Sequence, residues 1–254
     1  MSALLEVRDL SVRFGGVIAL DRVSFAVEAG QVVALIGPNG AGKTTLFNVI
    51  TRVYRPAGGT VLIDGDSVLA IRPHQVIRRG LARTFQNVAL FRSMTVLDNV
   101  LVGDHTQTKS GWLQASVPLP GAVAAESASR KRALEMIDFV GLGPHAQRPV
   151  AALPFGWQKR IELARALVSR PRLLLLDEPA GGISHEEVDD VSRLLRRVHK
   201  ELGVTMLLVE HHMAFVMGIS DRVVVLDFGK KIAEGTPAEV QRNPAVIEAY
   251  LGAA

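Results

Sequence analysis

A nine-residue segment near the N-terminus carries residue types that suit phosphate binding. Residues 37–45, GPNGAGKTT, satisfy the pattern G-x-x-x-x-G-K-S/T and lie between an apolar run and a helical pattern. The glycines allow successive backbone N–H groups to turn toward one centre, and the helix N-terminus adds partial positive charge. Lys43 can then reach the β- and γ-phosphates of a nucleotide, and the Thr44 hydroxyl can bind Mg²⁺. A glycine-rich turn that binds nothing is the alternative, and the strand and helix around the segment disfavour it. The predicted ATP-binding residues here are Gly37, Pro38, Asn39, Gly40, Ala41, Gly42, Lys43, Thr44 and Thr45.

A pair of carboxylates follows a second apolar run further along the chain. In RLLLLDEP, Asp177 lies at the predicted end of a buried strand, where its carboxylate can hold Mg²⁺ through water. Glu178 follows at once and is suited to polarise an attacking water. An isolated Asp-Glu pair is more often a solvated turn. Four preceding leucines and the upstream phosphate-binding segment favour the catalytic interpretation.

Short apolar runs alternate with helical patterns, and this alternation predicts the elements that position both segments. Residues 31–36, 173–177, 205–209 and 222–226 are expected to be buried strands, which indicates a parallel sheet covered on both faces. The first ~30 residues alternate apolar and polar, as antiparallel strands with one wet face do. Residues 87–170 look helical, interrupted by the Gly/Pro/Ser-rich segment 109–122, which we expect to be a surface loop.

Composition excludes several classes of protein. The 254 residues can form one α/β domain, and 29 Lys and Arg against 25 Asp and Glu give a formal charge of only +4. The basic residues are scattered, so no nucleic-acid partner is expected. The chain has no cysteine, which excludes disulfides and thiolate zinc sites and fits a reducing cytosol. The charged N-terminus predicts no signal peptide, and no apolar run approaches the ~20 residues of a membrane span.

Five further short elements follow in a fixed order along the chain. They are Phe14 in VRFGG, Gln86 in RTFQN, LPFGWQ at residues 153–158, GGIS at residues 181–184, and His211. Together with the two segments above, they make the chain resemble the ATP-binding subunit of an ATP-binding cassette transporter from about residue 4 to the C-terminus. Each element is weak alone, because an aromatic residue in a strand is usually core and a lone glutamine is usually surface.

The resemblance implies a role for each element. Phe14 would stack on adenine, Gln86 would complete the metal shell and link the nucleotide to a transmembrane partner, and His211 would act with Glu178 in catalysis by sensing the γ-phosphate. The signature segment would cap the ATP that a second ATPase subunit holds; its residues are Leu153, Pro154, Phe155, Gly156 and Trp157. The loop crossing to that subunit would be Gly182, Ile183 and Ser184.

Three features narrow the resemblance to the ATPases of branched-chain amino acid importers. They are the insertion at residues 109–128, the ending ISDRVVVLDFGKKIAEGTPAEV and the tail NPAVIEAYLG. The implied function is to hydrolyse ATP and energise a membrane importer for branched-chain amino acids or related small polar solutes. The partners would be transmembrane permease subunits, a second ATPase subunit in a homo- or heterodimer and, indirectly, a solute-binding protein. The protein would lie peripherally on the cytoplasmic face of the inner membrane, with ATP and Mg²⁺ as its cofactors.

Other classes of cassette ATPase stay open at this point. A ribosome-associated cassette protein usually carries two cassettes in one chain, and this chain has one. A chromosome-organising ATPase would need a long coiled coil, and no sustained heptads occur here. Lipopolysaccharide-export ATPases also resemble the chain but lack an insertion of this length.

The chain departs from the family pattern at three places. The usual signature is LSGGQ, and only Leu153 and Gly156 are kept. Pro154 offers no hydroxyl, yet proline suits a helix start, and we expect the amides of residues 155–157 to bind anions at the N-terminus of a helix that runs to Leu167. Ser184 stands where Asp or Asn is common, and His212 follows His211 where Asp is usual; we expect His212 to be a surface or capping residue.

The predicted fold is therefore an α/β P-loop NTPase, with a RecA-like core built on a parallel sheet. Residues 1–254 would form a single ATPase domain. The core with its N-terminal antiparallel β-subdomain would cover residues of about 1–86 and 171–254, and an inserted helical subdomain about 87–170.

Overall fold

Buried apolar strands form the sheet that carries the predicted phosphate-binding segment. The computed structural model describes residues 3–84, 89–104 and 120–251. Its larger sheet has the strand order β10-β9-β3-β8-β7-β6. All pairs in it are parallel except β9 with β10 at one edge. The bounds are β3 Val32–Ile36, β6 Leu81–Arg83, β7 Leu173–Asp177, β8 Thr205–Val209, β9 Arg222–Asp227 and β10 Lys230–Gly235. Every residue of β3, β7 and β8 is buried, as expected for parallel strands covered on both faces.

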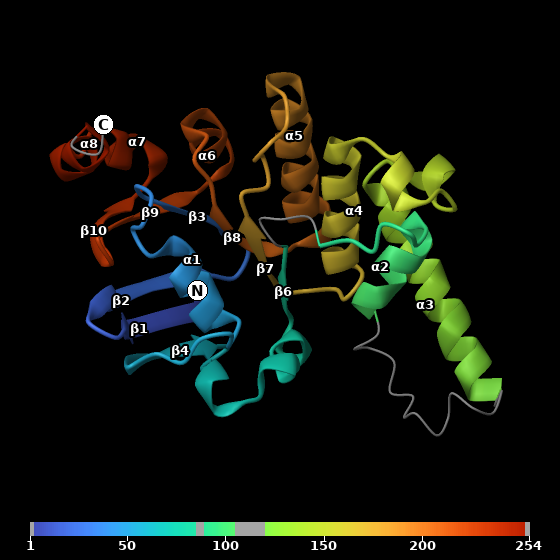
Figure 1. The fold of residues 1–254 in the computed structure, drawn as a ribbon, viewed down its shortest axis with the longest axis horizontal. Helices are drawn as coiled ribbons and strands as arrows, with labels where there is room; N and C mark the ends of the chain where they lie inside the picture. The colour runs from blue at the N-terminus through green and yellow to red at the C-terminus, as the bar shows by residue number, and fades with distance from the viewer. Residues whose placement is uncertain (1–2, 85–88, 105–119, 252–254) are drawn as a thin grey trace. The chain divides into compact units, whose positions relative to one another are not determined.

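Helices and a second sheet cover the two faces of this sheet. Figure 1 shows α5 (His185–Leu202) and α6 (Met213–Ile219) on one side, and α1 (Lys43–Ile50) with the second sheet on the other. The apolar side chains of α1, including the fully buried Phe47, belong to one core cluster with residues of both sheets. The helix that follows the phosphate-binding segment is thus fixed between two sheets. Two short helices, α7 (Pro237–Gln241) and α8 (Pro244–Leu251), follow β10.

The second sheet is antiparallel and has the order β2-β1-β4-β5. Its bounds are β1 Ala3–Phe14, β2 Val17–Glu28, β4 Gly58–Ile63 and β5 Asp66–Ser67. Alternating residues such as Leu5, Val7 and Leu10 are buried on its core side. The alternation in the first ~30 residues therefore correctly predicts antiparallel strands, because one face packs and the other stays wet.

Residues 84–171 form a separate compact unit, distinct from the unit of residues 1–83 and 172–254. Its described helices are α2 (Val96–Asp104), α3 (Pro120–Phe139) and α4 (Phe155–Leu167). In its interior, Asp104 of α2 accepts hydrogen bonds from Ser129 and Arg132 of α3, both at 2.5 Å. Across the described part of the chain, none of the helices combines the length and apolar character that crossing a membrane requires.

The structure confirms the α/β P-loop class and corrects several details of the sequence analysis. The four predicted strands are present as β3, β7, β8 and β9, whereas β4, β5, β6 and β10 were not predicted. Two of these, β5 and β6, have only 2 and 3 residues, too few for a detectable pattern. The segment 109–122 was expected to be a loop, but α3 already begins at Pro120, since proline is tolerated in the first turn of a helix. The rest of that segment, including Lys109, lies outside the described residues.

Candidate active site

The register of the parallel strands brings the predicted catalytic segments to one edge of the sheet. Strand β8 lies between β3 and β7, and Val209 pairs with Leu35 on one side and with Asp177 on the other. The residues that follow these strands must therefore lie side by side. They are the phosphate-binding segment after β3, Glu178 after β7, and His211 after β8.

Two glycines of the phosphate-binding segment are required by close backbone packing. Gly37 and Gly42 have φ values of 150° and 100°, which L-residues with side chains rarely adopt. A Cβ atom at Gly42 would lie 2.6 Å from the Ala19 carbonyl oxygen of β2, and one at Gly37 would collide with the Leu226 carbonyl. Gly229, in the turn between β9 and β10, donates its N–H to the Ala41 carbonyl at 3.1 Å. Strands β2 and β9 thus hold the loop in a conformation that a bulkier residue would prevent.

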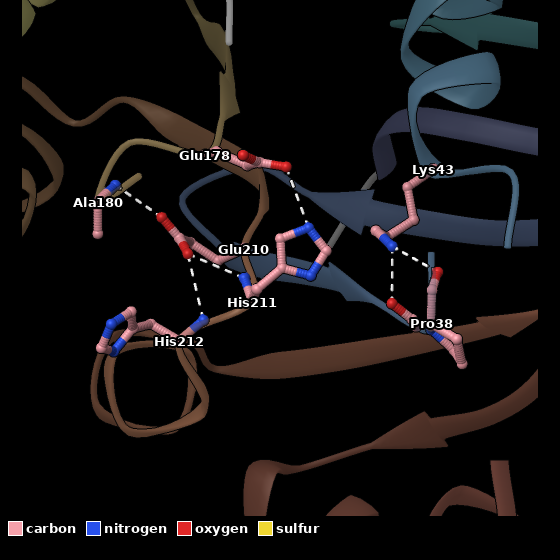
Figure 2. Close-up of polar contacts among 8 residues, drawn as sticks. Pro38, Lys43, Glu178, Ala180, Glu210, His211 and His212 are labelled. Atoms are coloured by element: carbon pink, nitrogen blue, oxygen red, sulfur yellow. Dashed lines mark hydrogen bonds and ion pairs between the residues drawn. The ribbon is translucent and has the colours of Figure 1, made fainter. Parts of the chain in front are cut away.

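Lys43 folds back over this loop. Its Nζ donates to the carbonyl oxygens of Gly37 at 2.6 Å and Pro38 at 2.8 Å, as Figure 2 shows for Pro38. Burial lowers the pKa of Lys43 from the usual 10.5, and the charges of Glu178 and Asp177 oppose that shift. An ammonium that is partly desolvated and near two carboxylates is well placed to exchange carbonyl partners for phosphate oxygens. The adjacent Thr44 side chain is exposed in the first turn of α1.

Asp177 takes part in an ion pair that the sequence analysis did not anticipate. Arg83, the last residue of β6, donates from Nη2 to Asp177 Oδ2 at 2.7 Å, and the two side chains are only 7% and 4% exposed. The same guanidinium donates to Asn48 Oδ1 of α1 at 2.8 Å and lies 5.4 Å from the centre of the Phe47 ring. Arg83 was missed because it is 94 residues from Asp177 in sequence, and its only signal was its place in RTFQN.

Glu178 and His211 meet as a hydrogen-bonded pair. The His211 Nε2 atom lies 3.0 Å from Glu178 Oε1 (Figure 2). Since an ionised carboxylate only accepts hydrogen bonds, this contact requires a proton on Nε2 of His211. Glu178 has a φ of 51°, so the chain turns sharply as it leaves β7. This turn separates the directions of the neighbouring carboxylates, one toward Arg83 and the other toward His211.

The segments after β7 and β8 are also joined by a buried glutamate that the sequence analysis overlooked. Glu210 is 2% exposed, and its oxygens accept backbone N–H groups of Ala180 at 2.6 Å, His211 at 2.8 Å and His212 at 3.2 Å. Figure 2 shows its carboxylate between these two segments. A charged residue directly after a fully apolar strand was the available signal. His212 is exposed and stands at the N-cap position of α6, as expected, although its side chain makes no capping hydrogen bond.

Phe14 is exposed rather than part of the core. It ends β1, is 47% exposed, and its ring meets the Tyr54 ring edge-on with centroids 5.2 Å apart. Its partner on β2 is Val17, two residues before Ala19, whose carbonyl lies against Gly42. A strand rises about 3.3 Å per residue, so Phe14 and its partner Val17 lie about 7 Å along β2 from the point where Ala19 meets the phosphate-binding loop.

The predicted crossing loop ends in a helix cap. Ser184 is the N-cap of α5: its hydroxyl accepts the Glu187 N–H at 3.4 Å, and Glu187 Oε2 accepts the Ser184 N–H at 2.9 Å. Gly182, with φ 74°, and Ile183 precede it. The capping-box spacing S-x-x-E was readable in the sequence, and it gives Ser184 a local task in place of the Asp or Asn of the resembling family.

The comparisons with known proteins agree with this geometry. Residues 20–181 match the family described as ABC transporter, and residues 230–254 match the family described as branched-chain amino acid ATP-binding cassette transporter. The chain belongs to the ABC transporter family. It therefore binds ATP and is the ATP-hydrolysing component of a transporter.

Similar proteins span almost the whole chain. It is 43% identical over 251 residues to the high-affinity branched-chain amino acid transport ATP-binding protein BraF of Pseudomonas aeruginosa, covering 99% of this chain and 98% of BraF. The same identity and coverage hold for LivG of Escherichia coli, which has the same descriptive name. Among solved structures, the ADP conformation of the ATP-binding cassette MJ1267 is 30% identical and superposes with a TM-score of 0.86 over 99% of this chain and 100% of MJ1267.

The signature segment of this ABC transporter ATPase lies in the helical unit and begins α4. Pro154 is the N-cap, so the helix starts one residue later, at Phe155. Phe155 is 45% exposed, while Gly156 is buried in the first turn. Because the first N–H groups of a helix have no intrahelical acceptor, the amides of Phe155 and Gly156 are available to an anion.

Trp157 and Leu153 of the signature segment make contacts within the helical unit. The Trp157 N–H was expected to bind an anion, but it donates to the Pro154 carbonyl at 3.0 Å, and the indole packs against the His145 ring with centroids 4.6 Å apart. Leu153 is 5% exposed, and its carbonyl accepts Gln158 Nε2 at 2.9 Å, so its side chain is part of this unit's core. Gln86, the predicted link to the transmembrane partner, lies outside the described residues.

Proposed function

We propose that this ABC transporter ATPase energises the import of branched-chain amino acids or related small polar solutes. The observation that carries the proposal is the likeness, over 99% of the chain, to BraF and LivG, both named for high-affinity branched-chain amino acid transport. The match of residues 230–254 to the branched-chain family supports the same class. Ribosome-associated and lipopolysaccharide-export functions are not favoured by these relatives.

The hydrolysis that drives import uses the groups gathered at the carboxyl edge of the sheet. The Glu178 carboxylate accepts a hydrogen bond from a water and directs its oxygen at the γ-phosphorus. The bond from the γ-phosphorus to the bridging oxygen breaks, ADP keeps that electron pair, and the water's proton passes to Glu178. Lys43 and the backbone N–H groups of residues 37–45 stabilise the charge that spreads over the phosphate oxygens. His211 holds the Glu178 carboxylate in its orientation through the 3.0 Å contact.

The donor set at this edge fits Mg²⁺. The Thr44 hydroxyl and the Asp177 carboxylate are hard oxygen ligands of the kind that Mg²⁺ prefers, and both are held on regular elements, α1 and β7. We assign Gln86 to the same shell from the family pattern. When bound, the ion would neutralise charge on the β- and γ-phosphates. Arg83 donates to Oδ2 of Asp177 at 2.7 Å and so holds this carboxylate at the end of β7.

The proposed assembly contains two ATPase subunits and the permease. The start of α4, where Pro154 and Phe155 are exposed, would contact the ATP held by the second subunit. The predicted crossing loop, residues 182–184, would contact that subunit directly. Permease subunits and, indirectly, a solute-binding protein complete the importer, and the chain would act peripherally on the cytoplasmic face of the inner membrane. The core and the helical unit together form its single ATPase domain.

Isolation from native membranes tests the assignment. Tagged protein should co-purify with a permease. Proteoliposomes made from that complex and its solute-binding protein should accumulate labelled leucine, isoleucine or valine when ATP is enclosed. The Glu178→Gln variant is the control: it should bind ATP but hydrolyse it roughly 10²–10⁴ times more slowly, and uptake should stop. Uptake of urea or an amide without any branched-chain amino acid would overturn the substrate class, and co-sedimentation with ribosomes in place of a permease would overturn the transport function.

A further inference from the structure

Glu210 is a buried carboxylate to which the hydrolysis mechanism gives no task. It directly follows β8 and is 2% exposed, although a carboxylate is rarely buried without strong partners. Its partners are three backbone N–H groups and no cation among the contacts of the described residues. Oε1 binds the segment after β7 through Ala180, and Oε2 binds the segment after β8 through His211 and His212. One side chain therefore fastens two loops that come from neighbouring strands (Figure 2).

These two loops carry the pair that orients the attacking water. Ala180 is two residues after Glu178, and His211 is next to Glu210 in sequence. The side chains of Glu178 and His211 meet at 3.0 Å, so the two loops are joined a second time on the side that faces Lys43 (Figure 2). A closed ring results, running from Glu178 through Ala180, Glu210 and His211 back to Glu178. A shift of either loop would change the distance between the catalytic carboxylate and the histidine.

The loop after Glu178 needs such a fastening. Glu178 has a φ of 51°, a left-handed conformation that is strained for a residue with a side chain and persists only when neighbouring contacts hold it. One contact is local, from the Gly181 N–H to the Glu178 carbonyl at 3.0 Å. The Glu178 N–H donates to the Val209 carbonyl of β8 at 2.9 Å, and the contact from Ala180 to Glu210, at 2.6 Å, fixes the far side of the turn to the segment after that strand.

A glutamine at this position could not make the same contacts. Three N–H donors converge on two carboxylate oxygens, and every position around them calls for an acceptor. The amide of glutamine would direct an N–H₂ group at one of these donors. Aspartate would keep the acceptors and the charge, but it is one methylene shorter and could not span both loops.

We propose that Glu210 is a positioning residue for ATP hydrolysis. It holds the turn after Glu178 and the backbone of His211 in the arrangement in which their side chains meet. The proposal rests on the hydrolytic roles given above to Glu178 and His211. Ala180 leads directly into residues 182–184. Glu210, which binds Ala180 and His211, therefore also connects the predicted crossing loop to His211.

Steady-state ATPase kinetics of full-length variants test the proposal. Glu210→Gln should lower kcat about 10- to 100-fold, the scale of a misplacement of about 1 Å in a catalytic group. The KM and the Kd for ATP should stay at their wild-type values, because the hydrogen bonds of Glu210 within the described residues go to Ala180, His211 and His212 and not to residues 37–45. Glu239→Gln is the matched control, because Glu239 accepts the Thr236 N–H at 2.7 Å at the start of α7, away from the site. It should keep the wild-type kcat.

Two further variants keep the proposal falsifiable if Glu210→Gln folds poorly. Glu210→Asp should lower kcat in the same direction but less. The double variant Glu210→Gln/His211→Ala should be no slower than His211→Ala alone, because both changes remove the same support of Glu178. Independent, multiplying losses in the double variant would overturn the proposal. A parallel loss of kcat and ATP affinity would also overturn it, since that indicates a general folding defect.

The outcome also separates this proposal from the one on which it rests. If Glu178→Gln hydrolyses ATP at the wild-type rate, the proposed hydrolytic roles fail. If Glu178→Gln and His211→Ala are slow but Glu210→Gln and Glu210→Asp turn over at the wild-type rate, only the positioning role of Glu210 fails.

Discussion

Replacing Arg83 by methionine tests whether the buried ion pair holds Asp177 in its place. Arg83 Nη2 and Asp177 Oδ2 are 2.7 Å apart, and the side chains are 7% and 4% exposed, so water screens them little. At that separation and an effective dielectric constant of about 20, their attraction is about 6 kcal/mol. Desolvation of both ions offsets part of it, and removing one partner of such a pair lowers the free energy of unfolding by about 3–5 kcal/mol. We expect a loss of this size for Arg83→Met.

Urea unfolding at pH 7, followed by circular dichroism, measures this loss. The matched control is Arg172→Met, because Arg172 pairs with Asp64 on the surface, where the side chains are 57% and 46% exposed. A pair so exposed contributes about 0.2–1 kcal/mol. The double variant Arg83→Met/Asp177→Leu should recover much of the loss, since the buried charge that loses its ion pair with Arg83 is then removed as well.

Nucleotide gives this prediction a second measurement. If Asp177 helps to hold Mg²⁺, then Mg²⁺ with a non-hydrolysable ATP analogue should reduce the stability difference between Arg83→Met and wild type, because the ion supplies positive charge near Asp177. The analogue without Mg²⁺ should not. A loss below about 1 kcal/mol for Arg83→Met, equal to the Arg172→Met control, would refute the reasoning, because it would mean that Asp177 does not depend on its buried partner.

Three further predictions concern the binding of nucleotide and of a second subunit. Burial lowers the pKa of Lys43 in the free protein, and bound phosphate should raise it, so ATP binding should take up a proton at a pH between the pKa of the free and of the ATP-bound protein. Calorimetric titration should therefore show that ATP affinity falls as the pH rises above the lowered pKa of the free protein, and Lys43→Arg should remove this dependence. Phe14→Ala should weaken ATP and GTP binding alike by about 1–3 kcal/mol, with Phe14→Tyr near neutral in the same fluorescence titration; unchanged affinity would exclude ring stacking. Gly156→Asp places a carboxylate in the first turn of α4, which suits the helix dipole but repels phosphate, so it should spare ATP binding by the monomer and prevent ATP-driven dimerisation in sedimentation; normal dimerisation would exclude the signature role.

The parts of the site that the sequence predicted are those whose residue types and neighbours in the chain suffice to define them. A fully apolar strand followed by G-x-x-x-x-G-K-S/T is specific for a phosphate-binding loop. The structure shows why two of its glycines are needed: Gly37 and Gly42 adopt positive φ values and pack against carbonyls of neighbouring strands. The same holds for Asp177 and Glu178, which follow four buried leucines. Strand order decides the rest, because β8 had to lie between β3 and β7 for His211 to reach Glu178.

The parts that the sequence did not predict depend on contacts between distant segments. Arg83 comes from β6, a strand of 3 residues, and its partner Asp177 is 94 residues away. Glu210 looks like any polar residue that ends a strand, and only the register with β7 shows that Ala180 lies within its reach. The signature pattern predicts that Trp157 contacts phosphate, whereas its ring packs against His145, 12 positions earlier in the same unit. Spacing along the chain contains none of this information.

The charges of the site explain why neighbouring carboxylates can have different tasks. Within a strand, adjacent side chains already point to opposite faces, and the left-handed turn at Glu178 redirects the second one further. Asp177 is thereby paired with the guanidinium of Arg83, while Glu178 contacts the imidazole of His211 and lies near Lys43. When ATP enters, Lys43 can turn from the carbonyls of Gly37 and Pro38 to the phosphates without leaving Asp177 unpaired. The contact of Glu178 with His211 stays in place during this exchange, because neither side chain takes part in the hydrogen bonds of Lys43.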